Sequence, residues 1–273
     1  MRGQLAVREM LYNNLKEKKV LEIRCGGGAH SALFKRKGAH ITAVDLTAER
    51  VNSTAQKLKM IPGKSKVLQA DAEQLPFEEN SFDIVYSNGV LHHAQNTDSC
   101  VAEAWRVLKP SGRIVLMLYA RHSIMFWTNL LIRALFNGSF FKEPEATWLG
   151  KLTEGKPKYG SSHNPYTRVY SAKEIKSLLS GFSEIKIRKN SFRLDYLPIP
   201  KGSEIRNWIL GKLGTKHSNV GTILYGAPII EDSNLEIALS PYLGWCLNIC
   251  VKNNKPKTSN CANKTIYEKK HVK

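Results

Sequence analysis

The stretch Lys19–Thr47 constrains the fold more than any other part of the 273-residue chain. It runs from a short apolar segment, Val20–Ile23, through three consecutive glycines to a second apolar segment that ends at Asp45. Parallel strands that are covered on both faces have this apolar character, and glycines let the backbone approach a ligand closely. The pattern predicts a strand, a tight turn, a helix over 29–37 and a second strand over 41–44.

The end of this stretch predicts a nucleotide-binding edge. The carboxyl ends of parallel strands meet at one edge of a doubly wound sheet, and nucleotides bind there. The N-terminal amides of the predicted helix favour an anionic group at the same edge. Asp45 stands where a carboxylate can accept both hydroxyls of a ribose. A dinucleotide-binding fingerprint would place glycine at position 31, but the chain has Ser31.

A third strand is expected over Val67–Ala70. It delivers Asp71 and Ala72, whose carboxylate and backbone amide provide a hydrogen-bond acceptor and a donor at the same edge. An ordinary surface loop remains the alternative for this segment.

A fourth strand is expected over Ser81–Asn88, and two adjacent histidines follow it. His92 and His93 are candidates for a general base because histidine titrates near neutral pH. The alternative is one histidine packed in the core and one in solvent.

The rest of the chain continues the alternation of helices and strands. We expect a helix over 98–108, a turn at Lys109–Gly112, a fifth strand over 113–119, a helix after the capping box Ser171–Glu174, a sixth strand around Ile185–Ile187, a helix over 203–213 and a last strand over 245–251.

These segments together resemble the class I S-adenosylmethionine (SAM) methyltransferases. The first motif of that family is an acid followed by Gly-x-Gly-x-Gly. Glu22 matches the acid, Gly26 and Gly28 match the second and third glycines, and Arg24 replaces the first. The resemblance is nearly continuous over Lys19–Tyr119 and is closest to the subgroup that contains the quinone-biosynthesis methyltransferases, which act on small molecules.

The resemblance implies an α/β fold: a Rossmann-like seven-stranded mixed sheet with an antiparallel last strand, flanked by helices and carrying helical or loop lid insertions. It implies one SAM-methyltransferase domain over 1–252, with insertions at about 121–170 and 190–241 that cover the substrate. The residues 253–273 form a basic tail that we expect to be disordered.

The resemblance also implies a SAM-dependent methyl transfer by in-line displacement to a small molecule, with quinone-like, lipid-like and secondary-metabolite-like acceptors as candidates. The expected cofactor-binding residues are Glu22, Gly26, Gly28, Asp45, Leu46, Asp71, Ala72, Ser87 and Asn88. The candidates for acceptor contacts are Tyr119, Tyr166 and Arg168. No catalytic residue is identified beyond the candidates His92 and His93, and no metal is expected.

Two other functions stay open at this point. Arg24 puts a long cationic side chain where the family keeps the backbone bare, which would fit a SAM-fold protein with impaired catalysis. The net charge of +18 would fit a nucleic-acid methyltransferase or binder. However, Lys252–Lys273 holds seven lysines and one glutamate, so this tail alone carries +6 of that charge. We therefore expect no specific nucleic-acid partner.

The composition favours a cytoplasmic protein. The five cysteines are odd in number and scattered, which indicates free thiols in a reducing compartment. No secretory signal is visible, and the longest apolar region, 114–136, is interrupted by charges. We expect the helix over 123–136 to be buried, although it could instead cover an apolar pocket or lie on a membrane surface. The oligomeric state is not predicted.

Overall fold

The computed structural model of the chain describes residue 9 and residues 14–153, 166–213 and 232–254. Almost all of the predicted tail lies outside these residues, as do parts of both predicted insertions. The chain divides into two compact units. Among the described residues, the sheet unit comprises residue 9 and residues 14–117, 172–187 and 249–254. The helical unit comprises the described residues 118–153, 166–171, 188–213 and 232–248. The assignment of 1–252 to one methyltransferase domain stays a prediction.

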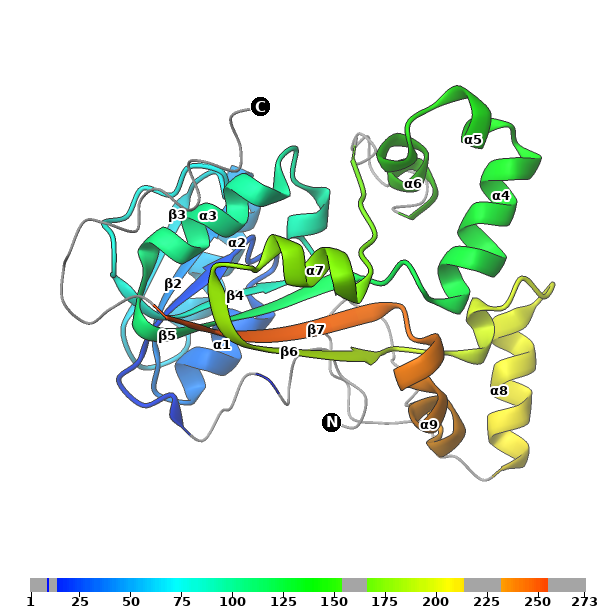
Figure 1. The fold of residues 1–273 in the computed structure, drawn as a ribbon. Helices are drawn as coiled ribbons and strands as arrows, with labels where there is room; N and C mark the ends of the chain where they lie inside the picture. The colour runs from blue at the N-terminus through cyan, green and yellow to red at the C-terminus, as the bar shows by residue number, and fades with distance from the viewer. Residues whose placement is uncertain (1–8, 10–13, 154–165, 214–231, 255–273) are drawn as a thin grey trace. The chain divides into compact units, whose positions relative to one another are not determined.

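Seven strands form one sheet in the order β3-β2-β1-β4-β5-β7-β6 (Figure 1). They are β1 (Lys19–Ile23), β2 (His40–Asp45), β3 (Ser65–Gln69), β4 (Phe82–Asn88), β5 (Leu108–Tyr119), β6 (Phe182–Asn190) and β7 (Cys246–Asn253). The pairs from β3 to β5 are parallel, and β7 runs antiparallel to β5. The predicted Rossmann-like mixed sheet with an antiparallel last strand is confirmed. Its order reverses between β1 and β4, the position at which doubly wound sheets bind ligands.

The centre of this sheet is apolar because β1 and β4 are covered on both faces. Val20, Leu21 and Val85 have no exposed surface, and Phe34 packs edge-on against the ring of Tyr86. The helices of the sheet unit are α1 (Ala29–Arg36), α2 (Ala48–Lys59), the 3₁₀ turn η2 (Leu91–His93), α3 (Thr97–Val107) and α7 (Ala172–Leu178). The helices α1 and α2 contact each other and the strand β2. Burial of this kind contributes about 1.5–3 kcal/mol for each large apolar side chain.

The predicted turn at Lys109–Gly112 lies inside β5 as a wide bulge. Leu108 pairs with Phe82 and Arg113 pairs with Ile84, so four residues of β5 stand opposite Asp83 alone. The bulge explains why Pro110 and Ser111 gave a turn pattern although the strand continues through them.

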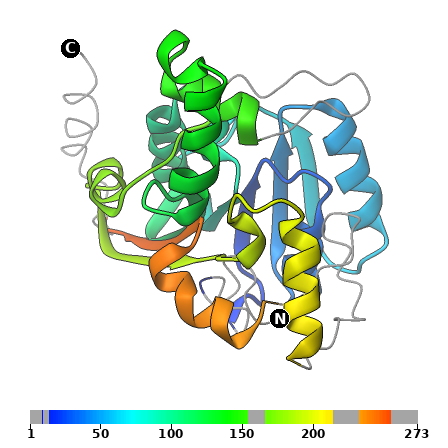
Figure 2. The same ribbon diagram turned by 90° about the vertical axis from the view of Figure 1, so that its right-hand side faces the viewer.

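The helical unit contains the π-helical turn η3 (Met125–Leu130), α4 (Leu131–Phe136), α5 (Ser139–Lys142), α6 (Glu145–Thr153), the 3₁₀ turn η4 (Leu194–Tyr196), α8 (Gly202–Lys212) and α9 (Asn234–Leu243). The predicted helix over 203–213 corresponds to α8, whereas α9 falls in a region expected to be irregular. Ser233 and Glu236 form a capping box at its start. The helices α8 and α9 lie side by side, joined by the buried pair Arg206–Glu236 at 2.6 Å (Figure 2).

The helix expected over 123–136 is only half buried. Phe126, Leu130 and Ala134 point into the helical unit, but Trp127 and Phe136 are exposed. The prediction that this helix is buried is therefore wrong for its outer face. Within the described ranges, none of the helices combines the length and the apolar character needed to cross a membrane.

Candidate functional site

The turn after β1 keeps a glycine-motif backbone although its first glycine is replaced. Arg24, Gly26 and Gly28 have φ angles of 57°, 54° and 70°, so alternate residues are left-handed. Glycine adopts this region readily, whereas a residue with a Cβ does so at a cost of about 1–2 kcal/mol. The Arg24 backbone therefore takes a left-handed conformation that a glycine would adopt without strain, and the cost is local strain.

The two remaining motif glycines have different neighbours. A Cβ on Gly28 would lie 2.8 Å from both Cγ2 and Oγ1 of Thr54, which belongs to α2. A Cβ on Gly26 would have no atom within 4 Å. Thr54 donates a hydrogen bond to the Gly26 carbonyl at 2.9 Å, and Lys57 donates to the Gly27 carbonyl. Gly28 thus fits the loop against α2, while Gly26 borders open space at the carboxyl edge.

Asp45 holds this loop by direct hydrogen bonds. Its Oδ2 accepts from the backbone N–H of Gly26 at 3.0 Å. Its Oδ1 accepts from the backbone N–H of Thr47 at 3.1 Å and from the Thr47 hydroxyl at 3.2 Å. Thr47 stands at the N-cap position of α2 without a capping side-chain bond, because its hydroxyl turns to Asp45. The buried carboxylate is therefore fixed at the end of β2, and an ionised carboxylate has about four lone-pair positions in all.

Glu22 is buried in the middle of the motif and is bonded to α1. The hydroxyl of Ser31 donates to its Oε2, and Nδ1 of His30 lies 3.8 Å from its Oε1. Burial raises the pKa of Glu22 to about 8 and lowers the pKa of His30 to about 4. Both groups are uncharged at neutral pH, so this contact is not an ion pair. Glu22 fixes the start of α1 beside the glycine turn.

The strand β3 brings Asp71 to the same edge as Asp45. Asp45 pairs with Gln69 across the two strands, and its carbonyl accepts from the N–H of Ala70 at 3.0 Å. Asp71 follows at once and is exposed, whereas Ala72 is buried. The two predicted carboxylates therefore end neighbouring strands, as the sequence pattern requires.

The loop after Asp71 is held by two residues of α3 that the sequence pattern did not identify. Glu103 accepts from the N–H of Leu75 at 2.7 Å, and Arg106 donates to the carbonyls of Phe77 at 2.7 Å and Leu75 at 2.9 Å. Arg106 also binds Glu103, with Nε 2.7 Å from Oε1. Burial alone would raise the pKa of Glu103, but hydrogen bonds, first from Arg106, hold it below its ordinary value. The i,i+3 spacing of opposite charges in the expected helix was the available signal.

The end of β4 contributes an unsatisfied acceptor. The hydroxyl of Ser87 donates to the Ile23 carbonyl at 3.2 Å, which ties β4 to β1. Asn88 follows, and its Oδ1 is buried without a hydrogen-bond partner among the described residues. Such an atom normally costs about 1–3 kcal/mol, so it points to a donor from a bound molecule. Leu46, after β2, is exposed at the same edge.

The two histidine candidates lie in η2 with ring centroids 4.1 Å apart. His92 has no exposed surface, and its pKa lies well below the ordinary value because of burial, His93 and then Arg24. His92 is therefore neutral and a weak base. His93 is 7% exposed, and a catalytic role for either residue stays a prediction.

The three candidates for acceptor contacts belong to the helical unit. Tyr119, the last residue of β5, packs against Trp245 with ring centroids 4.4 Å apart. The guanidinium of Arg168 lies over the Tyr166 ring at 5.8 Å. Their role toward an acceptor stays a prediction.

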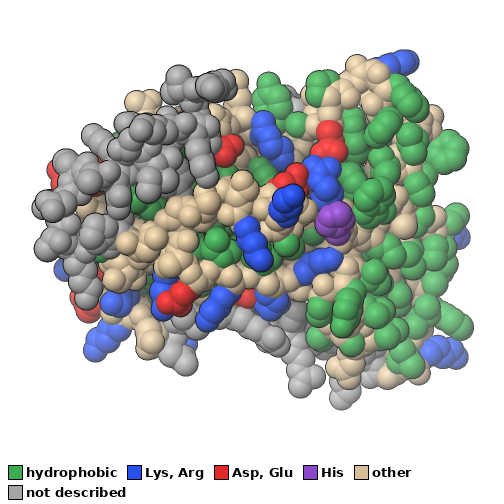
Figure 3. Space-filling model, in the orientation of Figure 1, with side chains coloured by type: hydrophobic (Ala, Val, Ile, Leu, Met, Phe, Trp, Pro, Cys, Tyr) green, Lys and Arg blue, Asp and Glu red, His purple; other side chains and the backbone are tan. Residues whose placement is uncertain are grey.

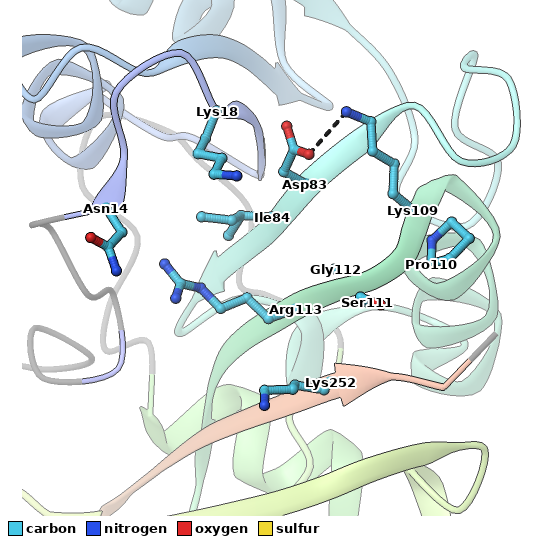
Figure 4. Close-up of a pocket in the computed structure, with 10 residues that line it drawn as sticks. All are labelled: Asn14, Lys18, Asp83, Ile84, Lys109, Pro110, Ser111, Gly112, Arg113 and Lys252. Carbon is cyan, nitrogen blue, oxygen red and sulfur yellow. Dashed lines mark hydrogen bonds and ion pairs between the residues drawn. The ribbon is translucent and has the colours of Figure 1, made fainter. Parts of the chain in front are cut away.

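A separate basic pocket of about 400 Å³ lies at the opposite, amino edge of β4 and β5 (Figure 4). Asp83 accepts from the N–H of Lys19 at 2.8 Å and from Lys109 at 2.9 Å, so its charge is compensated. The bond from Lys109 joins the bulge of β5 to Asp83 on β4. The pocket is lined by Lys18, Arg113 and Lys252 as well, and it is distinct from the edge that carries Asp45.

The family model described as "Methyltransferase domain" matches residues 21–116, which contain this whole edge. The chain is 30% identical over 176 residues to the ubiquinone biosynthesis O-methyltransferase of Dechloromonas aromatica, and the match covers 58% of the chain and 74% of that protein. The chain belongs to the SAM-dependent methyltransferases. This methyltransferase is therefore an enzyme of the transferase class with SAM as its cofactor.

Other relatives match a smaller part of their own length. The chain is 34% identical over 114 residues to the ubiquinone/menaquinone biosynthesis C-methyltransferase UbiE of Shewanella pealeana, covering 39% of the chain and 45% of that protein. The phosphoethanolamine N-methyltransferase 2 of Haemonchus contortus, solved with phosphomonomethylethanolamine and S-adenosylhomocysteine, shares the fold at a TM-score of 0.56 and 16% identity, covering 92% of the chain and 52% of that protein.

Proposed function

We propose that this methyltransferase transfers the SAM methyl group to a small apolar acceptor of the quinone-precursor type. The observation that carries this proposal is the 30% identity to a ubiquinone biosynthesis O-methyltransferase across 74% of that protein. A second relative is named for ubiquinone and menaquinone biosynthesis. The cytoplasmic location and the lack of a specific nucleic-acid partner stay predictions.

The carboxyl edge of the sheet fits the cofactor. Gly26 borders open space, and Asn88 carries a buried acceptor without a partner among the residues described. In this proposal Asp45 accepts from the ribose hydroxyls, Asp71 from the adenine amino group, and Asn88 from the ammonium of the methionine part. The sulfonium of bound SAM supplies an electrophilic methyl group and a good leaving group.

The chain's own task is then to align the acceptor and exclude water, which lowers the barrier without a covalent or metal-bound intermediate. An oxygen acceptor also has to lose a proton. His93 is the better candidate for that base, because burial depresses the pKa of its neighbour His92. A carbon acceptor of the quinol type needs less help because the ring itself is activated.

The two other functions raised by the sequence gain no support from the relatives. The backbone of Arg24 is left-handed, as are the backbones of Gly26 and Gly28. The replacement of the first motif glycine by arginine therefore does not by itself remove the turn after β1. Two of the relatives that match are named for ubiquinone or menaquinone biosynthesis.

The proposal is tested with methyl-labelled SAM and a panel of an apolar catechol, a quinol, a polar amine and an RNA. We expect label in the catechol or the quinol, and mass spectrometry of the product distinguishes oxygen from carbon methylation. Label in the RNA or the amine alone, with SAM binding intact by calorimetry, would contradict the acceptor class.

A further inference from the structure

The helical unit exposes a cluster of large apolar side chains on η3, α4 and α5. We call it the aromatic patch, and it consists of Trp127, Ile132, Leu135, Phe136, Phe140 and Phe141. Phe136 is 89% exposed and Phe141 is 77% exposed. Figure 3 shows hydrophobic side chains gathered over this part of the helical unit. Contiguous exposed apolar groups of this kind mark an interaction surface.

The patch is additional to the apolar face that the helices need for folding. Phe126, Leu130 and Ala134 recur at intervals of four residues and are buried, and the ring of Phe126 stacks on Trp148 with centroids 6.3 Å apart. An ordinary surface helix presents polar residues on the opposite face. Here several outward positions are apolar instead. Trp127 and Phe140 are half exposed and also contact buried rings of the unit. Phe136 and Phe141 are the most exposed members of the patch, and they add apolar surface beyond what the unit buries.

The charges of this segment are all of one sign. The sequence contains no aspartate or glutamate from Ala104 to Lys142. Arg133 of α4 and Lys142 of α5 are exposed beside the patch. Aromatic and aliphatic side chains flanked by cations are typical of helices that lie in the interface of a membrane with anionic lipids. Each such cation contributes about 1 kcal/mol of attraction near an anionic surface.

A lipid surface fits these charges better than a second copy of the chain does. In a two-fold symmetric dimer the same patch would meet itself, which brings Arg133 and Lys142 of both copies together. The acids that follow in the sequence, Glu143 and Glu145, are already paired with Lys151 and Arg121. An anionic lipid surface accepts the apolar groups and pairs with the cations at once. The helices η3, α4 and α5 are short, which suits lying in the interface rather than crossing the bilayer.

We propose that the aromatic patch docks the enzyme on an anionic lipid surface. Docking would place the helical unit where an apolar acceptor dissolves, and in that respect the inference rests on the proposed function. The binding of lipid itself requires neither SAM nor an acceptor, so the two proposals can fail separately.

Co-sedimentation of the full chain with vesicles tests this proposal. The vesicles are phosphatidylcholine alone, or phosphatidylcholine with about a third phosphatidylglycerol, at physiological salt. The double variant F136S/F141S removes the two most exposed aromatic residues. The control M60S removes an apolar side chain that is also 77% exposed but belongs to the sheet unit. Thermal unfolding and SAM titration are measured on every variant.

We expect the wild-type chain and M60S to sediment with the anionic vesicles, and F136S/F141S to lose about tenfold or more in its partition coefficient. The charge variant R133Q/K142Q should lose affinity for the anionic vesicles only. All variants should bind SAM as the wild type does, so a chain that binds vesicles but not SAM would count against the proposed function alone.

Two results would overturn the docking proposal. Vesicle binding that is unchanged in F136S/F141S would assign the lipid contact to other cations of the chain. A wild-type dimer that becomes monomeric in F136S/F141S, without vesicle binding in either, would assign the patch to a second copy of the chain.

Discussion

The carboxyl edge of the sheet unit and the aromatic patch of the helical unit differ in how far the chain itself satisfies them. At the sheet edge, Asp45 and Glu22 are bonded to the glycine turn and to α1, and Glu103 holds the loop after Asp71. On the patch, Phe136 and Phe141 remain 89% and 77% exposed. The carboxyl edge is thus ordered by internal contacts, whereas the most exposed side chains of the patch are not covered by the described residues of their own unit.

The largest predicted effect compares the buried face and the exposed face of the helical segment formed by η3 and α4. Phe126→Ala removes a ring that is 4% exposed, and we expect a loss of about 3–5 kcal/mol in the free energy of unfolding. Phe136→Ala removes a ring that is 89% exposed, and the loss should stay below about 0.5 kcal/mol. Urea denaturation measures both. Equal losses would mean that the outer face packs as the inner face does.

A second pair of variants tests whether the glycine turn at the carboxyl edge of the sheet is held rigidly against α2. Gly28→Ala places a Cβ against Thr54 at a positive φ, and we expect a loss of about 2–4 kcal/mol in stability together with weaker SAM binding. Gly26→Ala meets no atom within 4 Å, so only backbone strain of about 1–2 kcal/mol remains in the free enzyme. Calorimetry and urea denaturation measure both variants.

Gly27→Ala is the matched control, because its Cβ would come no closer than 3.9 Å to Lys57 and its φ is not positive. It should keep stability and SAM affinity. A Gly28→Ala variant as stable as Gly27→Ala would show that the loop is free to shift away from α2. That result would contradict the account in which internal contacts fix the loop.

The pH dependence of stability sharpens the account of Glu22. Its folded-state pKa of about 8 lies above the ordinary 4.5, so between these values the unfolded carboxyl ionises while the folded one stays protonated. The free energy of unfolding therefore falls as pH rises, by up to about 1.4 kcal/mol per pH unit, and levels off above about pH 8. Glu22→Gln should remove this contribution while its amide oxygen still accepts from Ser31.

The comparison between wild type and Glu22→Gln is made from pH 6.5 to pH 8. Both proteins contain His30, whose pKa is lowered by burial, so its contribution drops out of the difference between the two curves. The wild type should lose more stability than the variant across this range. Parallel curves would show that Glu22 is already ionised in the folded enzyme.

The smallest effect concerns Arg24. Arg24→Gly relieves a left-handed residue but adds freedom to the unfolded chain, and these terms of about 1 kcal/mol each nearly cancel. Arg24→Ala keeps the strain and removes the side chain. We expect SAM affinity to change by less than about threefold in both, since the backbone is already that of the motif. A large gain in both variants would show that the guanidinium obstructs the cofactor.

The sheet and the arrangement of its strand ends could be predicted from the sequence because local patterns determine them. Apolar runs and turn glycines predicted the strands from β1 to β4, and the acids after β2 and β3 fell on one edge. The start of β5 was predicted too late, with a turn at Lys109–Gly112, because Pro110 and Ser111 give the same local pattern in a turn and in a bulge. The helix α9 was missed although Ser233 and Glu236 carry the capping-box spacing.

The remaining features depend on contacts between distant segments. The bonds from Glu103 and Arg106 to the loop after Asp71 join residues about thirty positions apart. The i,i+3 spacing of these two charges indicates their own ion pair but not the loop that they hold. The exposure of Phe136 was also not predictable. A helix that is apolar on all sides can be buried in a core or bound to a surface, and its sequence does not distinguish the two.

The most direct test of the carboxyl edge is calorimetric titration of S-adenosylhomocysteine into wild type, Asp45→Ala and Asp83→Ala. Both aspartates accept a backbone N–H, from Gly26 at 3.0 Å and from Lys19 at 2.8 Å, but they lie at opposite edges of the sheet. We expect Asp45→Ala to bind about ten- to a hundredfold more weakly, a loss of about 1–3 kcal/mol, and Asp83→Ala to bind as wild type does. Unchanged binding by Asp45→Ala, or equal weakening of both variants, would contradict a cofactor site at this edge.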